Sequence, residues 1–167
     1  VRSSAASDVY KRQKAVAQSV NIPIVLYNIP KATGCPLSPE LVDRLADIPN
    51  IKAIKDSSGE LERIQAYAKI AENKDFEVLI GSDSKISYAY GLGATAAVAG
   101  TSNVIVDTLV GLDKALNEGD TETAEKLQKD IDEQRVYLAG CEKMIPPASR
   151  HCFYCNQDVY YSFLPVD

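Results

Sequence analysis

Short apolar runs alternate with longer segments of helical periodicity through the middle of the chain. Runs of strand length, rich in β-branched residues or alanine, occupy residues 22–28, 50–55, 76–81 and 94–100. Apolar residues recur at helical spacing in residues 38–48, 59–72, 84–93, 104–120 and 121–140. Ser38 and Pro39 suit a helix start, and Gly119 suits a helix end. Thr121 is a cap candidate for the last helix. The pattern predicts repeated strand–helix units.

Three of the predicted strands end at one regular spacing. Tyr27, Lys55 and Asp83 lie at strand ends, each 28 residues after the one before. That interval suits one strand, one helix and two short loops, and such units form a parallel sheet with helices outside. The predicted fold class is α/β, and four such units are half of a (β/α)8 TIM barrel. An open doubly wound sheet is the structural alternative, although no glycine-rich phosphate motif follows these strands.

Composition narrows the class of protein. The 167 residues are 46% hydrophobic and 25% charged, which is typical of one soluble globular domain. The net charge of −5 argues against nucleic-acid or acidic-membrane partners. No apolar run approaches the roughly 18 residues that span a bilayer, and the first residues lack an apolar signal core. Four irregularly spaced cysteines favour a reduced, cytoplasmic protein.

Both ends of the chain depart from the repeating pattern. The opening "DVYKRQ" resembles a translated transposon end from library preparation, so we expect residues 1–13 to be a non-native, adapter-derived segment. Residues 14–145 then form the half-barrel domain. Residues 146–167 lack periodicity and hold the only histidine and two cysteines, which predicts a frameshifted or disordered tail.

A lysine ends the strand at residues 50–55. Alternation places Ile51, Ala53 and Lys55 on one face, which in a barrel points into the interior. Lys55 is then the interior residue nearest the C-terminal mouth, where barrel active sites form. Burial disfavours the ammonium form of a lysine, and a neutral amine can form a Schiff base with a carbonyl compound. The plainer alternative is a lysine that ends its strand and reaches water.

A tyrosine ends the preceding strand. Neighbouring parallel strands lie roughly 5 Å apart, so Tyr27 and Lys55 can face one pocket. A tyrosine hydroxyl can relay protons to and from a carbinolamine and an aldehyde oxygen. Alone, Tyr27 is equally consistent with an ordinary interior tyrosine.

Four motifs together resemble those of a known family. "YNIP" with "TG" after it, "IKDSSG", "GSD" and "GATAAVAGTSN" occur in the order and spacing of the pyruvate-dependent class I aldolases. That family contains dihydrodipicolinate synthase, N-acetylneuraminate lyase and the 2-keto-3-deoxygluconate aldolases. The resemblance covers residues 15–138 and implies the second half of a TIM barrel, with four βα units and the C-terminal helices.

The resemblance also implies roles for single residues. Lys55 matches the Schiff-base lysine, and Tyr27 matches the acid/base tyrosine. Val98 matches the position whose backbone carbonyl lies near bound pyruvate. Gly81 and Asp83 match a loop that meets the aldehyde partner, although Asp83 is equally consistent with a helix cap. The implied substrates are pyruvate and an aldehyde, with no organic cofactor and no metal, and full-length relatives are implied to be homotetramers.

Two departures from the family pattern affect which activity the resemblance implies. Dihydrodipicolinate synthases usually carry an arginine two residues after the YNxP proline, where this chain has Ala32. With "ATG" and "GSD", this favours the 2-keto-3-deoxy sugar acid aldolases over 4-hydroxy-tetrahydrodipicolinate synthase of lysine biosynthesis. The family's first four strands, which carry the loop that holds the pyruvate carboxylate, are also missing. We therefore expect this polypeptide alone to be nearly inactive.

The sequence also raises two other classes of function, a zinc site and a binding module. "HCFYC" offers two cysteines and a histidine, but a structural zinc site needs about four ligands. Cys35 and Cys141 are isolated, so the sequence does not favour zinc. A non-catalytic half-barrel binding module is the alternative of a different class.

Overall fold

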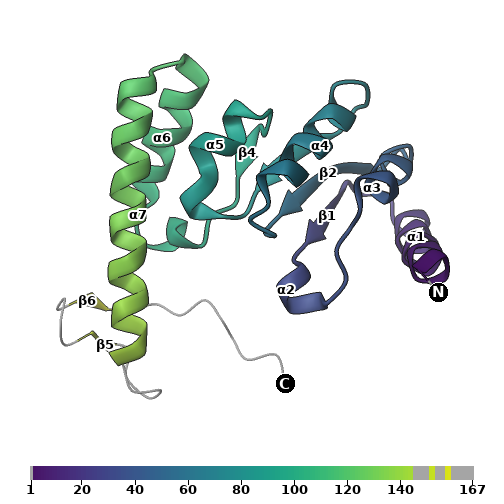
Figure 1. The fold of residues 1–167 in the computed structure, drawn as a ribbon, viewed down its shortest axis with the longest axis horizontal. Helices are drawn as coiled ribbons and strands as arrows, with labels where there is room; N and C mark the ends of the chain where they lie inside the picture. Colours follow the sequence, from purple (N-terminus) through teal and green to yellow (C-terminus); the bar gives the residue numbers. More distant parts are fainter. Residues whose placement is uncertain (1, 145–150, 153–156, 159–167) are drawn as a thin grey trace. The chain divides into compact units, whose positions relative to one another are not determined.

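Four parallel strands pair in sequence order in the computed structural model, which describes residues 2–144, 151–152 and 157–158. The sheet order is β1–β2–β3–β4 (Figure 1). The strands are β1 (Ile24–Asn28), β2 (Ile51–Asp56), β3 (Glu77–Ile80) and β4 (Ala96–Ala97). A doubly wound sheet reverses its strand order at a switch point, and this order has no reversal. The predicted α/β class with a parallel sheet is confirmed.

The chain divides into two units, residues 1–100 and residues 101–167. The first unit holds the sheet with α1 (Arg2–Gln18), α2 (Pro30–Thr33), α3 (Pro39–Leu45), α4 (Leu61–Ala71), the 3-10 turn η1 (Asp83–Lys85) and α5 (Ile86–Gly91). The 3-10 turn η2 (Gly100–Asn103) spans the boundary between the units. The second unit continues with α6 (Val106–Glu118), α7 (Thr121–Met144) and an antiparallel pair, β5 (His151–Cys152) and β6 (Gln157–Asp158).

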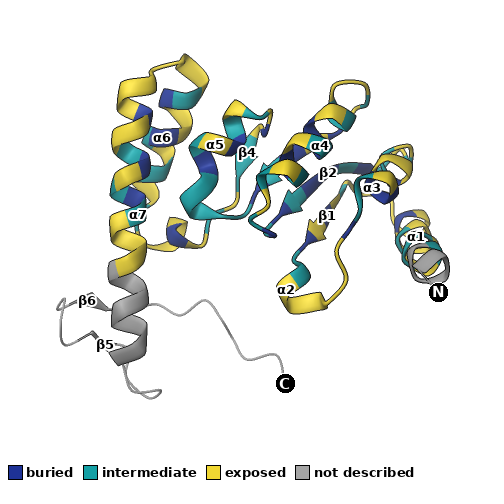
Figure 2. Ribbon diagram, viewed as in Figure 1, coloured by how far each residue is buried: buried dark blue, intermediate teal, exposed yellow. Residues whose placement is uncertain are grey.

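Helices cover one face of the four-stranded sheet, and the two faces differ in burial (Figure 2). On the helix-covered face Leu26 is 3% exposed and Ile54 is fully buried. On the other face Val25 is 51% exposed and Tyr27 is 49% exposed. Full burial of one such aliphatic side chain contributes about 1.5–3 kcal/mol. In β1, the hydrophobic contribution to stability therefore comes mainly from the side chain on the helix-covered face.

The helix boundaries follow local signals, with one correction. Ser38 Oγ accepts a hydrogen bond from Leu41 N (3.3 Å), and α3 has a proline in its first turn, as predicted. Gly119 adopts φ 75° at the end of α6, also as predicted. The prediction for Thr121 is wrong, because Asp120 Oδ1 accepts from Thr123 N (3.1 Å). Hydrogen bonding from Thr123, first through its side chain and then through its backbone N–H, lowers the pKa of the Asp120 carboxyl.

Strand β4 is shorter than the predicted run 94–100. Thr95 N still donates to Val78 O and Val98 N to Ile80 O, each at 2.9 Å, so the ladder extends one residue beyond both ends of β4. The helix α2 was not predicted, because "PKAT" is too short to show a helical period.

Two of the sequence predictions concern the ends of the chain, residues 1–13 and residues 146–167. Helix α1 includes most of residues 1–13, and the Arg44 guanidinium stacks over the Tyr10 ring at 4.1 Å. The adapter origin of residues 1–13 stays a prediction. Most of the predicted tail, residues 146–167, lies outside the described residues. None of the described helices is both long enough and apolar enough to cross a bilayer.

Tyr67 joins α4 to the segment that precedes α3. Its ring is fully buried, and its hydroxyl donates a 2.6 Å hydrogen bond to Leu37 O. Burial raises the pKa of Tyr67 to about 12, because the phenolate form would lose its solvation. The folded state therefore binds the phenolic proton more tightly than the unfolded chain.

We expect Tyr67→Phe to change both stability and its alkaline pH dependence. At neutral pH the free energy of unfolding should fall by about 1 kcal/mol, because the hydrogen bond to Leu37 is lost. The stability linked to the raised pKa is fully present below the unfolded pKa of about 10 and lost as pH rises towards about 12. Urea unfolding at neutral and alkaline pH should show a smaller alkaline loss in the variant. Tyr88→Phe, at a 66% exposed position, is the control; equal alkaline losses in parent and Tyr67→Phe would contradict the prediction.

Candidate active site

Tyr27 and Lys55 lie side by side at the C-terminal ends of β1 and β2. They are Cα partners in the parallel ladder, and Lys55 Nζ lies 4.6 Å from the centroid of the Tyr27 ring. An exposed contact between an ammonium group and an aromatic ring contributes about 0.5–1 kcal/mol. The structure thus brings together the two residues to which the sequence assigned acid/base and Schiff-base roles.

The surroundings of Lys55 differ from the predicted enclosed interior. Lys55 is half-buried and Tyr27 is 49% exposed, because they project from the sheet face that the helices do not cover. In the part of the chain that the structure describes, this face leaves Tyr27 and Val25 about half exposed. Enclosure of the amine needs a further layer over this face.

Gly81 provides the space through which the Lys55 side chain passes. Its backbone N–H donates to Asp56 O at 2.7 Å, which holds the residue after β3 against the end of β2. A Cβ on Gly81 would lie 2.8 Å from Lys55 Cε and 2.1 Å from Ser57 Oγ, closer than side-chain atoms pack. The aldehyde-loop role of Gly81 stays a prediction, and the structure shows that its missing side chain leaves room for the lysine.

Asp83 and Val98 lie in the loops that follow β3 and β4. Asp83 Oδ1 accepts a hydrogen bond from Gly100 N at 3.2 Å, so it links these two loops. Ser82 stands at the N-cap position of η1 and makes no side-chain capping hydrogen bond, and both alternatives for Asp83 stay predictions. Val98 is 45% exposed. Both residues therefore lie at the same end of the sheet as Lys55, as parallel strands require.

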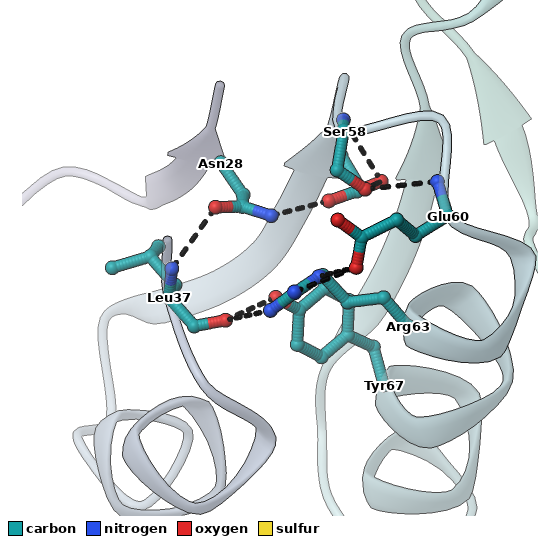
Figure 3. Close-up of polar contacts among 7 residues, drawn as sticks. Asn28, Leu37, Ser58, Glu60, Arg63 and Tyr67 are labelled. Carbon is teal, nitrogen blue, oxygen red and sulfur yellow. Dashed lines mark hydrogen bonds and ion pairs between the residues drawn. The ribbon is translucent and has the colours of Figure 1, made fainter. Parts of the chain in front are cut away.

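A buried polar pair next to Tyr27 and Lys55 was not predicted. Asn28 Nδ2 donates to Asp56 Oδ1 at 2.5 Å, and both side chains are fully buried (Figure 3). The sequence did hold a signal for it. Asn28 and Asp56 each follow a predicted site residue, so alternation places both on the helix-covered face, where a polar group requires a partner.

The described residues also form a groove away from Lys55. A groove of about 680 Å³ is lined by residues that include Lys14, Arg44 and Asn50. It lies where residues lead into β1 and β2, at the opposite end of these strands from Lys55. Among the described residues, no group of three histidine, cysteine or acidic side chains could hold a metal ion. The side chains of the "HCFYC" segment are not described.

Comparison with known proteins gives the family. The Dihydrodipicolinate synthetase family matches residues 3–139. The 4-hydroxy-tetrahydrodipicolinate synthase of Methanothrix thermoacetophila is 39% identical over 119 residues, which are 71% of this chain and 40% of the relative. The chain therefore spans less than half the length of this curated relative.

Two solved structures share the fold. The chloride-inhibited dihydrodipicolinate synthase of Acinetobacter baumannii, solved with pyruvate, is 32% identical with a TM-score of 0.70, covering 74% of this chain and 42% of that one. A sialic acid aldolase of Ruminococcus gnavus, solved as a catalytic lysine mutant, is 25% identical with a TM-score of 0.71, covering 77% of this chain and 42% of that one. Together with the sheet order, these matches give half of a TIM barrel, and the chain belongs to the dihydrodipicolinate synthetase family.

Proposed function

We propose that Lys55 forms a Schiff base with the keto carbon of pyruvate. The observation that carries this proposal is the contact between Lys55 and Tyr27 at the C-terminal ends of adjacent strands. The amine attacks the carbonyl carbon, water leaves, and the protonated imine withdraws electrons from the neighbouring carbon. A carbon–carbon bond to an aldehyde can then form or break at that carbon. Related structures solved with pyruvate, or as a catalytic lysine mutant, support this chemistry.

Tyr27 is proposed as the group that moves protons during these steps. Its ring lies beside the Lys55 ammonium group, so its hydroxyl is carried on the strand next to the reacting carbon. A hydroxyl in that place can give a proton to the departing water and exchange one with the aldehyde oxygen. Val98, Gly81 and Asp83 lie on the loops beside this pair and are proposed to contact the substrates.

The names of the relatives favour a synthase over a sugar acid aldolase. The Methanothrix relative is a 4-hydroxy-tetrahydrodipicolinate synthase, and the Acinetobacter structure is a dihydrodipicolinate synthase. The sequence motifs favoured a 2-keto-3-deoxy sugar acid aldolase, and this is therefore the weaker of the two proposals. Ala32 still lacks the guanidinium that would hold a carboxylate on the aldehyde by two hydrogen bonds. A cytoplasmic location and a homotetrameric whole protein belong to the same proposal.

We further propose that the polypeptide of 167 residues is nearly inactive by itself. Tyr27 is about half exposed and Lys55 is half-buried, so water reaches the reacting groups. The chain covers 40% of a synthase relative, and the remainder of such a protein is proposed to enclose the pocket and hold the pyruvate carboxylate. Loss of that positioning removes most of the advantage of a prearranged amine.

Reductive trapping tests the Schiff-base proposal. Incubation with pyruvate and borohydride, followed by peptide mass spectrometry, should give slow, substoichiometric labelling confined to Lys55. Lys55→Arg should abolish the label, and Lys52→Arg, on the opposite side of the same strand, should leave it unchanged. Labelling spread evenly over the lysines would contradict the role of Lys55. Rapid stoichiometric labelling would contradict the proposed inactivity.

Gly81→Ala should affect both stability and trapping. The new methyl group forces Ser57 Oγ and Lys55 Cε to move, so we expect the free energy of unfolding to fall by about 1–3 kcal/mol and the Lys55 label to decrease. Urea unfolding and the trapping assay measure the two effects. Gly91→Ala is the control, because a Cβ there meets no atom within 4 Å. A Gly81→Ala protein as stable and as readily labelled as its parent would show that the lysine does not follow this path.

A further inference from the structure

Asn28 and Asp56 occupy the positions immediately after the two proposed catalytic residues. The ladder pairs Tyr27 with Lys55 and then Asn28 with Asp56. Because side chains alternate along a strand, the second pair lies on the opposite face of the sheet from the first. Asn28 and Asp56 therefore do not share the open face with Tyr27 and Lys55, yet they belong to the same two strand ends.

The Asp56 carboxylate is fully buried, and its oxygens have matched donors. Oδ1 accepts from Asn28 Nδ2 at 2.5 Å. Oδ2 accepts from Ser58 Oγ at 2.7 Å and from Ser58 N at 3.2 Å. A buried charge is tolerated only with such compensation, so the geometry of the donors is tightly specified. The pair consequently holds the end of β1 and the loop after β2 in one arrangement.

The hydrogen bonds continue into the helical layer (Figure 3). Asn28 Oδ1 accepts from Leu37 N at 3.0 Å. Leu37 O in turn accepts from Tyr67 OH at 2.6 Å and from Arg63 Nη1 at 3.1 Å, both on α4. The strand ends are therefore fastened to α4 and to the segment that leads into α3.

The backbone of Asp56 extends the same restraint to the third strand. Asp56 O accepts from Gly81 N at 2.7 Å, and Ser57 N donates to Asn28 O at 2.8 Å. Gly81 is the residue whose missing side chain leaves room for Lys55. One buried residue thus contacts the strand that carries Tyr27 and the glycine that shapes the path of Lys55.

We propose that Asn28 and Asp56 are positioning residues that hold Lys55 beside Tyr27. The pair fixes how far the ends of β1 and β2 extend relative to each other, and a slip of one residue would turn Tyr27 to the other face. The catalytic meaning of this arrangement rests on the function proposed for Lys55, whereas the arrangement itself can be measured without any reaction.

An exchange of the two side chains separates positioning from simple stabilisation. In the double variant Asn28→Asp with Asp56→Asn, the carboxylate at position 28 can accept from Leu37 N and from the new amide at position 56. The amide oxygen at position 56 can accept from Ser58. Each single variant breaks this match. Asn28→Asp places two carboxylates against each other, and Asp56→Asn leaves one donor without its acceptor.

The readout is a resonance that reports the contact between Lys55 and Tyr27. Reductive ¹³C-methylation of the lysines gives dimethylamino signals, and the signal of Lys55 is assigned by its loss in Lys55→Arg. Lys55 Nζ lies 4.6 Å from the centroid of the Tyr27 ring, so this signal should be displaced by the ring and should move in Tyr27→Leu. Circular dichroism and urea unfolding report separately whether each variant is folded.

We expect the exchanged double variant to retain the displaced Lys55 signal and each folded single variant to lose it. Asp75→Asn is the matched control, because it breaks an exposed ion pair with Lys52, which lies on β2 with Lys55. This variant should leave the Lys55 signal unchanged. A displaced signal that persists in a folded single variant would overturn the proposal. If both single variants unfold, the double variant decides: a retained signal supports the proposal, and a folded double variant without it overturns the proposal.

Failure of this proposal can be distinguished from failure of the proposed function. The methylation experiment contains no pyruvate, so it reports geometry alone. If trapping with pyruvate never labels Lys55 while the methyl signals behave as expected, the function is wrong and the positioning stands. If Lys55 is labelled while its signal is insensitive to the buried pair, the positioning is wrong and the function stands.

Discussion

The register between β1 and β2 is the constraint on which the candidate site depends. It sets Tyr27 opposite Lys55 on one face and Asn28 opposite Asp56 on the other. A slip between the two strands would separate the desolvated Asp56 carboxylate from its donor on β1, Asn28 Nδ2. The same constraint therefore serves stability on the covered face and the placement of reactive groups on the open one.

The two faces of the sheet carry different kinds of side chain. The covered face carries aliphatic residues and the buried pair of Asn28 and Asp56, and it packs against the helices. The open face carries the amine, the phenol and the loops that contain Gly81 and Val98. A parallel sheet gathers the C-terminal ends of its strands at one end, so residues far apart in the sequence meet there.

The strands and the pairing of Tyr27 with Lys55 were predictable because they follow from alternation and from a constant spacing. Helix α2, the short β4 and the Asp120 cap were not, since each depends on backbone hydrogen bonds that leave no apolar period. Asn28 and Asp56 were missed for a related reason. Each stands at a predicted strand end with no motif around it, and only the register shows that they face each other. The exposure of the open face also differs from the enclosed interior that was predicted for Lys55, because four strands do not close a barrel.

The most direct test of this arrangement is the nuclear Overhauser effect between the ε-methylene protons of Lys55 and the ring protons of Tyr27 in the folded chain. The structure predicts a clear cross-peak, because Lys55 Nζ lies 4.6 Å from the ring centroid. A folded, fully assigned protein with no such cross-peak would contradict the adjacency of amine and phenol on which the site and its chemistry rest.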